Sequence, residues 1–211
     1  MIRRTLPFIV LAAVACSQRS PWRSIEPLAP LVPGGAAASS RPSGPAPSPD
    51  DAAPPDATTV AHLRGLLIPV GGVDSMRLDD SFDAPRDGGT RTHDAIDIMA
   101  PRGTPVLAVS DGRILRLMKS SKGGLTLYAA DLESQFVYYY AHLDRYHPKV
   151  YSGKPLMRGD TLGFVGTTGN AAKELPHLHF QVMRMPADGK YMNGTPINPY
   201  PLLRKTASSQ R

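Results

Sequence analysis

The feature that most limits the fold of this chain is a series of short apolar segments separated by turn signals. The segments cover residues 105–109, 113–117, 125–128 and 136–140, with pairs such as Asp111-Gly112 and Ser152-Gly153 between them. No helical period is sustained, whereas short runs bounded by turn residues are typical of β-strands. We therefore predict a mostly-β domain.

A change in composition sets the limits of this domain. Ten of the chain's 22 prolines fall between residues 17 and 61, mixed with Ala, Ser and Gly. Such sequence buries too little apolar surface to offset the entropy of ordering, and its prolines favour an extended spacer. We predict a disordered tether over residues 16–61, a folded domain over 62–205 and a tail over 206–211. A disordered propeptide with no need for reach is the alternative for the first segment.

The N-terminus has the pattern of an export signal. Arg3 and Arg4 precede the apolar run 6–15, which is too short to span a bilayer. The run ends at Ala13-Val14-Ala15-Cys16, which resembles a bacterial lipoprotein box. We predict a signal peptide over residues 1–15 and a lipid anchor on Cys16, in the cell envelope, with the outer membrane preferred. An ordinary signal with an incidental cysteine is the alternative. Because Cys16 is the only cysteine, the fold contains no intramolecular disulfide.

The charge of the chain is moderately basic and scattered. The formal net charge is +6, and residues 62–211 contain 19 Lys and Arg against 14 Asp and Glu. No basic stripe indicates nucleic-acid binding. A moderately basic charge is equally compatible with binding to an anionic wall polymer and to an anionic membrane surface.

Two histidines share one face of a predicted strand over residues 176–182. His177, His179 and Gln181 alternate with Leu178, Phe180 and Val182, so one face is polar and the other fits a core. Imidazoles one pleat apart can bind one metal ion, or one can bind metal while the other moves protons. Two half-buried histidines without a function are the alternative for the pair alone.

Two further segments carry candidate site residues. In 93–98, His93, Ala95 and Asp97 would share a strand face. A His and a carboxylate placed in this way, together with one His from another strand, make a three-ligand set for catalytic Zn²⁺. In 138–143, His142 would share a face with Tyr138 and Tyr140. Each histidine alone also fits a structural role. The remaining histidines, His62 and His147, lie in contexts that do not suit a metal.

Together these segments resemble the lysostaphin/LytM-type zinc peptidases of bacterial cell walls, over about residues 86–200. The matching motifs, in order, are His93-x-x-x-Asp97, Gly103-Thr-Pro-Val with Asp111-Gly112, Tyr140-Ala-His-Leu143, a glycine series over 159–169, and His177-Leu-His179-Phe. Several separated motifs in the right order are more specific than any one of them.

The resemblance implies a fold, a cofactor and residue roles. The fold would be a compact antiparallel β structure, sandwich-like, of the duplicated hybrid motif type. His93, Asp97 and His179 would bind one Zn²⁺ per chain, His177 would handle the proton of the attacking water, and His142 would help hold that water and the intermediate. The substrate would be peptidoglycan stem peptides in cross-links.

The chain also departs from the family pattern. Ala95 stands where the family usually has glycine, and Gln181 stands where it usually has glutamate. Residues 170–176, directly before His177, also differ from the usual family sequence. These differences concern substrate preference more than catalysis. The main alternative is a non-catalytic LytM domain that activates a wall amidase or serves as a scaffold, although such domains typically lack some of the five site residues. A carrier-type β domain fails because no lysine lies in a carrier motif.

Overall fold

The computed structural model describes residues 63 and 65–204. The predicted signal peptide, the lipid anchor at Cys16, the tether over 16–61, His62 and the tail over 206–211 lie outside the described residues. Within the described part, no helix is long and apolar enough to cross a membrane.

The described residues form a mostly-β domain, as predicted. The strands are β1 (Pro85–Arg86), β2 (Arg91–Thr92), β3 (Ile96–Met99), β4 (Pro105–Leu107), β5 (Gly112–Ser120), β6 (Gly124–Asp131), β7 (Phe136–Tyr146), β8 (Pro155–Leu156), β9 (Thr161–Val165), β10 (His177–Arg184) and β11 (Thr195–Ile197). The helical turns are η2 (Ser75–Arg77), η3 (Asp87–Gly89), η4 (Tyr191–Asn193) and α2 (Tyr200–Leu203). All the strand pairings are antiparallel.

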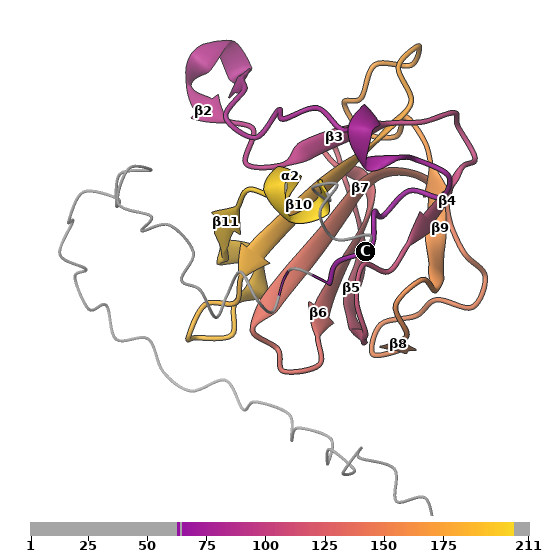
Figure 1. The fold of residues 1–211 in the computed structure, drawn as a ribbon, viewed down its shortest axis with the longest axis vertical. Coiled ribbons are helices and arrows are strands. Elements are labelled where there is room, and N and C mark those ends of the chain that lie inside the picture. Colours follow the sequence, from indigo (N-terminus) through magenta and orange to yellow (C-terminus); the bar gives the residue numbers. More distant parts are fainter. Residues whose placement is uncertain (1–62, 64, 205–211) are drawn as a thin grey trace, which may run out of the picture. The chain divides into compact units, whose positions relative to one another are not determined.

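Strand β10 occupies an interior position in the nine-stranded sheet (Figure 1). On one side it pairs with β7, and on the other it pairs first with β3 and then with β11. The register places His179 opposite Asp97 on β3 and opposite Ala141 on β7. Three segments distant in sequence therefore meet at the middle of β10. Strands β1 and β2 form a separate two-stranded hairpin.

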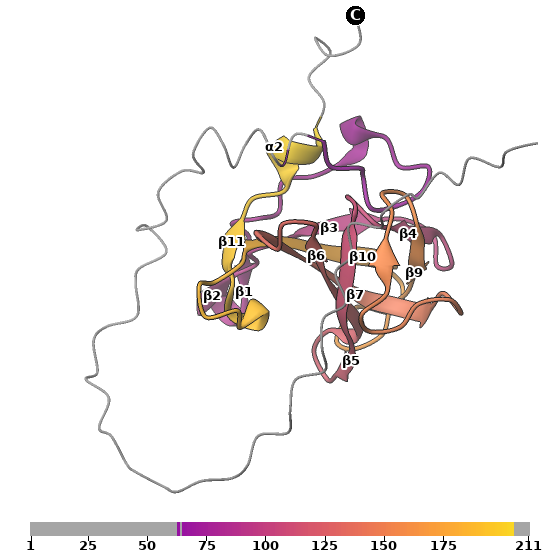
Figure 2. The same cartoon turned by 90° about the horizontal axis from the view of Figure 1, so that it is seen from below.

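The alternation predicted for β10 is confirmed. Leu178, Phe180 and Val182 have no exposed surface and belong to the main apolar core. That core lies between one face of the sheet and the segments that cover it, which contribute Leu66, Val70, Leu78 and Leu203. Figure 2 shows α2 and the segment that precedes β1 on the same side of the sheet. The opposite face of β10 is thereby left for the polar side chains.

A close backbone contact joins the β5–β6 turn to the segment that follows β9. Gly169 has a φ of +74°, and a Cβ on it would lie 2.2 Å from the Lys122 carbonyl oxygen and 2.3 Å from the Gly124 amide nitrogen. The Asn170 amide donates to the same Lys122 carbonyl at 2.9 Å. Only glycine fits at position 169 without moving the backbone.

We expect Gly169→Ala to lower the free energy of unfolding by about 2–4 kcal/mol, because it adds a backbone clash to the left-handed strain. Gly153 is the matched control, since its φ is +89° and a Cβ there would meet nothing within 4 Å. Gly153→Ala should cost only about 1–2 kcal/mol. Urea unfolding of both variants measures the difference, and equal losses would contradict the close contact.

Candidate metal and catalytic site

The polar face of β10 forms the floor of a groove with a volume of about 500 Å³. His177, His179 and Gln181 all line it, and they share one strand face as the sequence pattern predicted. The walls come from the β1–β2 hairpin, from β7 and its neighbouring β5–β6 turn, and from the segment after β9. The groove contains all five predicted site residues: His93, Asp97, His142, His177 and His179.

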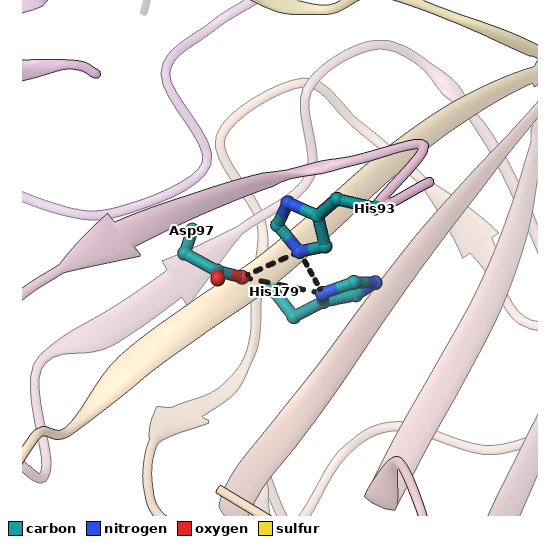
Figure 3. Close-up of side chains that lie close together, drawn as sticks. All are labelled: His93, Asp97 and His179. Atoms are coloured by element: carbon teal, nitrogen blue, oxygen red, sulfur yellow. Dashed lines mark hydrogen bonds and ion pairs between the residues drawn. The ribbon is translucent and has the colours of Figure 1, made fainter. Parts of the chain in front are cut away.

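Three of these residues converge on one point (Figure 3). His93 Nε2 lies 3.0 Å from His179 Nδ1 and 3.1 Å from Asp97 Oδ1. The third side of the triangle, from His179 Nδ1 to Asp97 Oδ1, is 3.2 Å. Two nitrogens and one carboxylate oxygen thus face one another almost equidistantly.

The chemistry and spacing of these three atoms fit a zinc ion. Donors about 2.0–2.1 Å from a zinc ion at tetrahedral angles lie about 3.3 Å from one another, close to the separations found here. Two imidazoles and one carboxylate are also a ligand set of catalytic zinc sites, which leave a fourth position open. The residues present therefore suit Zn²⁺.

Ser81 holds two of the three donors in place. His93 Nδ1 lies 2.9 Å from the Ser81 carbonyl oxygen, so Nδ1 donates to it and the Nε2 lone pair faces the other donors. The Asp97 amide donates to Ser81 Oγ at 3.2 Å. Sequence reasoning missed Ser81, because no local pattern connects it with residues 12 and 16 positions later.

His93 reaches the site from a turn and not from a strand, which corrects one expectation. Strand β3 begins at Ile96, and Asp94 has a φ of +58°. Thr92 Oγ1 donates to Asp94 Oδ1 at 2.6 Å, while the Asp94 amide donates to the Phe82 carbonyl at 2.9 Å. This turn buries the His93 ring beside Asp97, so the two residues meet without sharing a strand face.

The expectation that His142 shares a face with Tyr138 and Tyr140 is also wrong. Both tyrosines lie in the core, whereas His142 lines the groove next to Ala141. The β6–β7 register shifts here, because Leu127 pairs with Tyr140 but Leu125 pairs with Leu143. The extra residue forms a bulge, and His142 adopts a φ of +61°. This bulge turns His142 from the core face to the groove.

The two remaining histidines are held in the same tautomer. His142 Nδ1 and His177 Nδ1 each lie 2.8 Å from a backbone carbonyl, of Thr168 and Leu175 respectively. In the neutral rings Nδ1 therefore carries the proton, and the Nε2 lone pair is left for the groove. His177 Nε2 is 3.8 Å from Asp97 Oδ1. The centroids of the His142 and His177 rings are 5.0 Å apart. Both histidines can thus accept a proton beside the three donors.

Burial and hydrogen bonding set the charges of the site. Burial lowers the pKa of His142 to about 4, against a smaller opposite effect of the hydrogen bond to Thr168, so this ring is neutral at neutral pH. Burial also lowers the pKa of His179, opposed by Asp97. Burial raises the pKa of Asp97, but its close contacts with the His179 and His93 rings outweigh burial and hold the pKa far below its usual range. Neutral imidazoles and an ionised carboxylate are the forms that bind metal.

Residues 91–199, which contain all five groove residues named above, match Peptidase family M23. The chain belongs to peptidase family M23. His147, whose sequence context does not suit a metal, lies outside the groove. Its Nδ1 accepts a hydrogen bond from the Lys149 amide at 3.3 Å.

Relatives of this M23 domain include two bacterial endopeptidases. It is 35% identical over 114 residues to the DD-carboxypeptidase/endopeptidase Mpg of Neisseria meningitidis, covering 52% of this chain and 22% of that protein. It is 29% identical over 127 residues to the peptidoglycan DD-endopeptidase ShyC of Vibrio cholerae, covering 58% and 27%. The chain therefore spans only about a quarter of the length of these relatives.

A solved structure of Helicobacter pylori Csd3 has a similar fold. The TM-score is 0.51 at 26% sequence identity, and the match covers 67% of this chain and 35% of that one. The antiparallel β architecture expected from the family resemblance is therefore confirmed.

Proposed function

We propose that this chain is a zinc-dependent endopeptidase that hydrolyses peptide bonds in peptidoglycan cross-links. The convergence of His93 Nε2, Asp97 Oδ1 and His179 Nδ1 within 3.2 Å carries the proposal, since these atoms suit one Zn²⁺. M23 membership and the relative named as a peptidoglycan DD-endopeptidase support the substrate class.

The hydrogen bonds of the groove residues support the roles that the family resemblance implies. Zinc at the three donors would polarise a peptide carbonyl and increase the acidity of a water molecule. His177 accepts the proton of the attacking water at Nε2, because its Nδ1 is tied to Leu175, and it later returns a proton to the leaving amine. Neutral His142 accepts a hydrogen bond from the same water and orients it. Once it holds the water proton, the His177 Nε2–H can donate to the developing oxyanion before the proton passes to the leaving amine.

The test is digestion of purified peptidoglycan by the full chain, with and without a chelator, followed by identification of the products. We expect release of cleaved cross-link peptides that stops with the chelator and returns with added zinc. Cleavage that persists in the chelator would contradict the zinc proposal. Zinc binding at one ion per chain without cleavage of any wall peptide would favour the non-catalytic activator.

We further propose that the chain is exported and anchored by a lipid on Cys16. The n-region, apolar run and lipoprotein-like box of residues 1–16 support this. A tether over residues 16–61 would then let the M23 domain reach a wall polymer from the membrane.

Cys16→Ser should move the protein from the membrane fraction to the soluble fraction of the cell envelope, because one change removes the only site for the lipid. Fractionation and immunoblotting measure the shift, and Ser17→Ala serves as the control that should leave the protein at the membrane. Unchanged membrane association of Cys16→Ser would contradict lipidation.

A further inference from the structure

Strand β1 places an arginine directly against the carboxylate of the candidate metal site. Arg86 Nη2 lies 2.7 Å from Asp97 Oδ2, while Asp97 Oδ1 faces His93 and His179. The two oxygens of one carboxylate therefore have separate partners. Arg86 precedes residue 91, where the match to the M23 family begins, so the family match does not include it.

The hairpin that carries Arg86 is anchored on both sides of the groove. At its base, the His93 amide donates to the Ala84 carbonyl at 3.0 Å. At its tip, Asp87 Oδ2 accepts from Arg91 Nε at 2.8 Å and lies 3.4 Å from Lys122 Nζ on the β5–β6 turn. The backbone contact at the base fixes the direction in which Arg86 leaves the backbone.

The surroundings of the Arg86–Asp97 pair distinguish it from an ordinary surface ion pair. The side chains of Arg86 and Asp97 retain 34% and 24% of their exposure, so water screens the pair only in part. Exposed ion pairs contribute about 0–1 kcal/mol to folding, so we expect the Arg86–Asp97 pair to add little to the stability of the fold. Its geometric effect is larger, because it occupies the one Asp97 oxygen that does not face the histidines.

We propose that Arg86 is a positioning residue for the metal site, and this inference rests on the zinc binding of the proposed function. By holding Oδ2, Arg86 fixes the rotation of the Asp97 carboxylate and offers a single oxygen to the point where His93 and His179 converge. Partners that orient a ligand in this way typically affect metal affinity by about 10–100-fold. Arg86 thus performs for Asp97 what the Ser81 carbonyl does for His93.

The experiment measures zinc affinity of the full chain by competition with a chromogenic chelator. We expect Arg86→Met to weaken zinc binding about 10–100-fold, whereas Arg86→Lys recovers most of the affinity, because a single Nη2–Oδ2 contact needs only one donor. Arg91→Met is the matched control on the same hairpin, since Arg91 bonds Asp87 and the Thr92 carbonyl but not Asp97. It should change the affinity less than about threefold, far below the effect expected for an orienting partner.

A cobalt-substituted sample gives a second readout. Freeing Oδ2 in Arg86→Met should change the visible absorption of bound Co²⁺, because the absorption depends on the number and arrangement of ligand atoms, and Arg86→Lys should restore it. Circular dichroism and urea unfolding check that each variant is folded, and Arg86→Lys tests the inference if Arg86→Met does not fold.

The outcomes separate this inference from the proposed function. Wild-type zinc affinity and an unchanged Co²⁺ spectrum in a folded Arg86→Met would overturn the positioning role and leave the peptidase proposal intact. Weakened zinc binding in a chain that cleaves no peptidoglycan would support the positioning role and contradict the peptidase. A wild-type chain that binds no zinc would overturn both.

Discussion

His179→Ala is expected to abolish zinc binding and to lower peptidoglycan hydrolysis by at least about 10³-fold, equivalent to about 4 kcal/mol of transition-state stabilisation. His179 provides one of the three donor atoms, and its Nδ1 lies 3.0 Å from His93 Nε2 and 3.2 Å from Asp97 Oδ1. Two remaining donors cannot hold the ion in the same geometry. Isothermal titration with zinc and product analysis of peptidoglycan digests measure the two losses.

The control for His179→Ala is His147→Ala, which removes an imidazole away from the groove. It should bind one zinc ion and cleave at the wild-type rate. Thermal unfolding adds an independent comparison, because a ligand that binds only the folded state raises the melting temperature. Zinc should stabilise the wild type and His147→Ala but not His179→Ala. Full activity of His179→Ala would exclude the proposed ligand set.

His177→Ala is expected to lower the turnover number by about 10²–10⁴-fold while zinc still binds. The His177 ring is tied to Leu175 through Nδ1, and its Nε2 is 3.8 Å from Asp97 Oδ1, so it lies beside the donors without being one of the three closest. His142→Ala should behave similarly, because His142 presents Nε2 to the same groove. Loss of activity with retained metal separates these residues from the ligands.

Zinc titration of His177→Ala and His142→Ala decides this separation. Both should bind zinc within about tenfold of the wild type, below the full effect of losing a ligand. If His177→Ala lost zinc as completely as His179→Ala, the roles of the two histidines on β10 would need to be exchanged. A free imidazole in the assay offers a further check, because it can replace a missing proton acceptor but not a positioned ligand.

The strand pattern of the sequence was sufficient to predict β10 and the use of its two faces. Apolar and polar residues alternate there without interruption, and Leu178 and Phe180 are fully buried while His177 and His179 line the groove. Local alternation determines such a strand, because one face must be removed from water. Geometry alone left the two histidines equivalent, and their separate roles came from the resemblance to the family.

The positions of His93 and His142 could not be predicted from alternation. Both depend on residues with positive φ, Asp94 at +58° and His142 itself at +61°, which break the two-residue period of a strand. Tertiary contacts stabilise these conformations, among them the Asp94 amide to Phe82 and the His142 amide to Gly123. A rule based on neighbouring residues does not include such contacts.

The contributions of Ser81 and Arg86 depend on packing between segments. Neither residue belongs to a motif, and each reaches the site because the chain before β3 returns along it. A hairpin signal was present in Asp87-Gly88-Gly89, where both glycines have positive φ. The signal indicates a turn but not which carboxylate the flanking arginine will meet.

The interior position of β10 has a consequence for the order of folding. Its contacts with β3 join residues about 80 positions apart, such as His179 and Asp97, and pairings of this range form late because long loops must close first. A partly folded or incomplete chain therefore has no assembled set of donors. Binding of the proposed zinc ion would then report completed folding, and the central strand should be among the last to exchange its amide hydrogens.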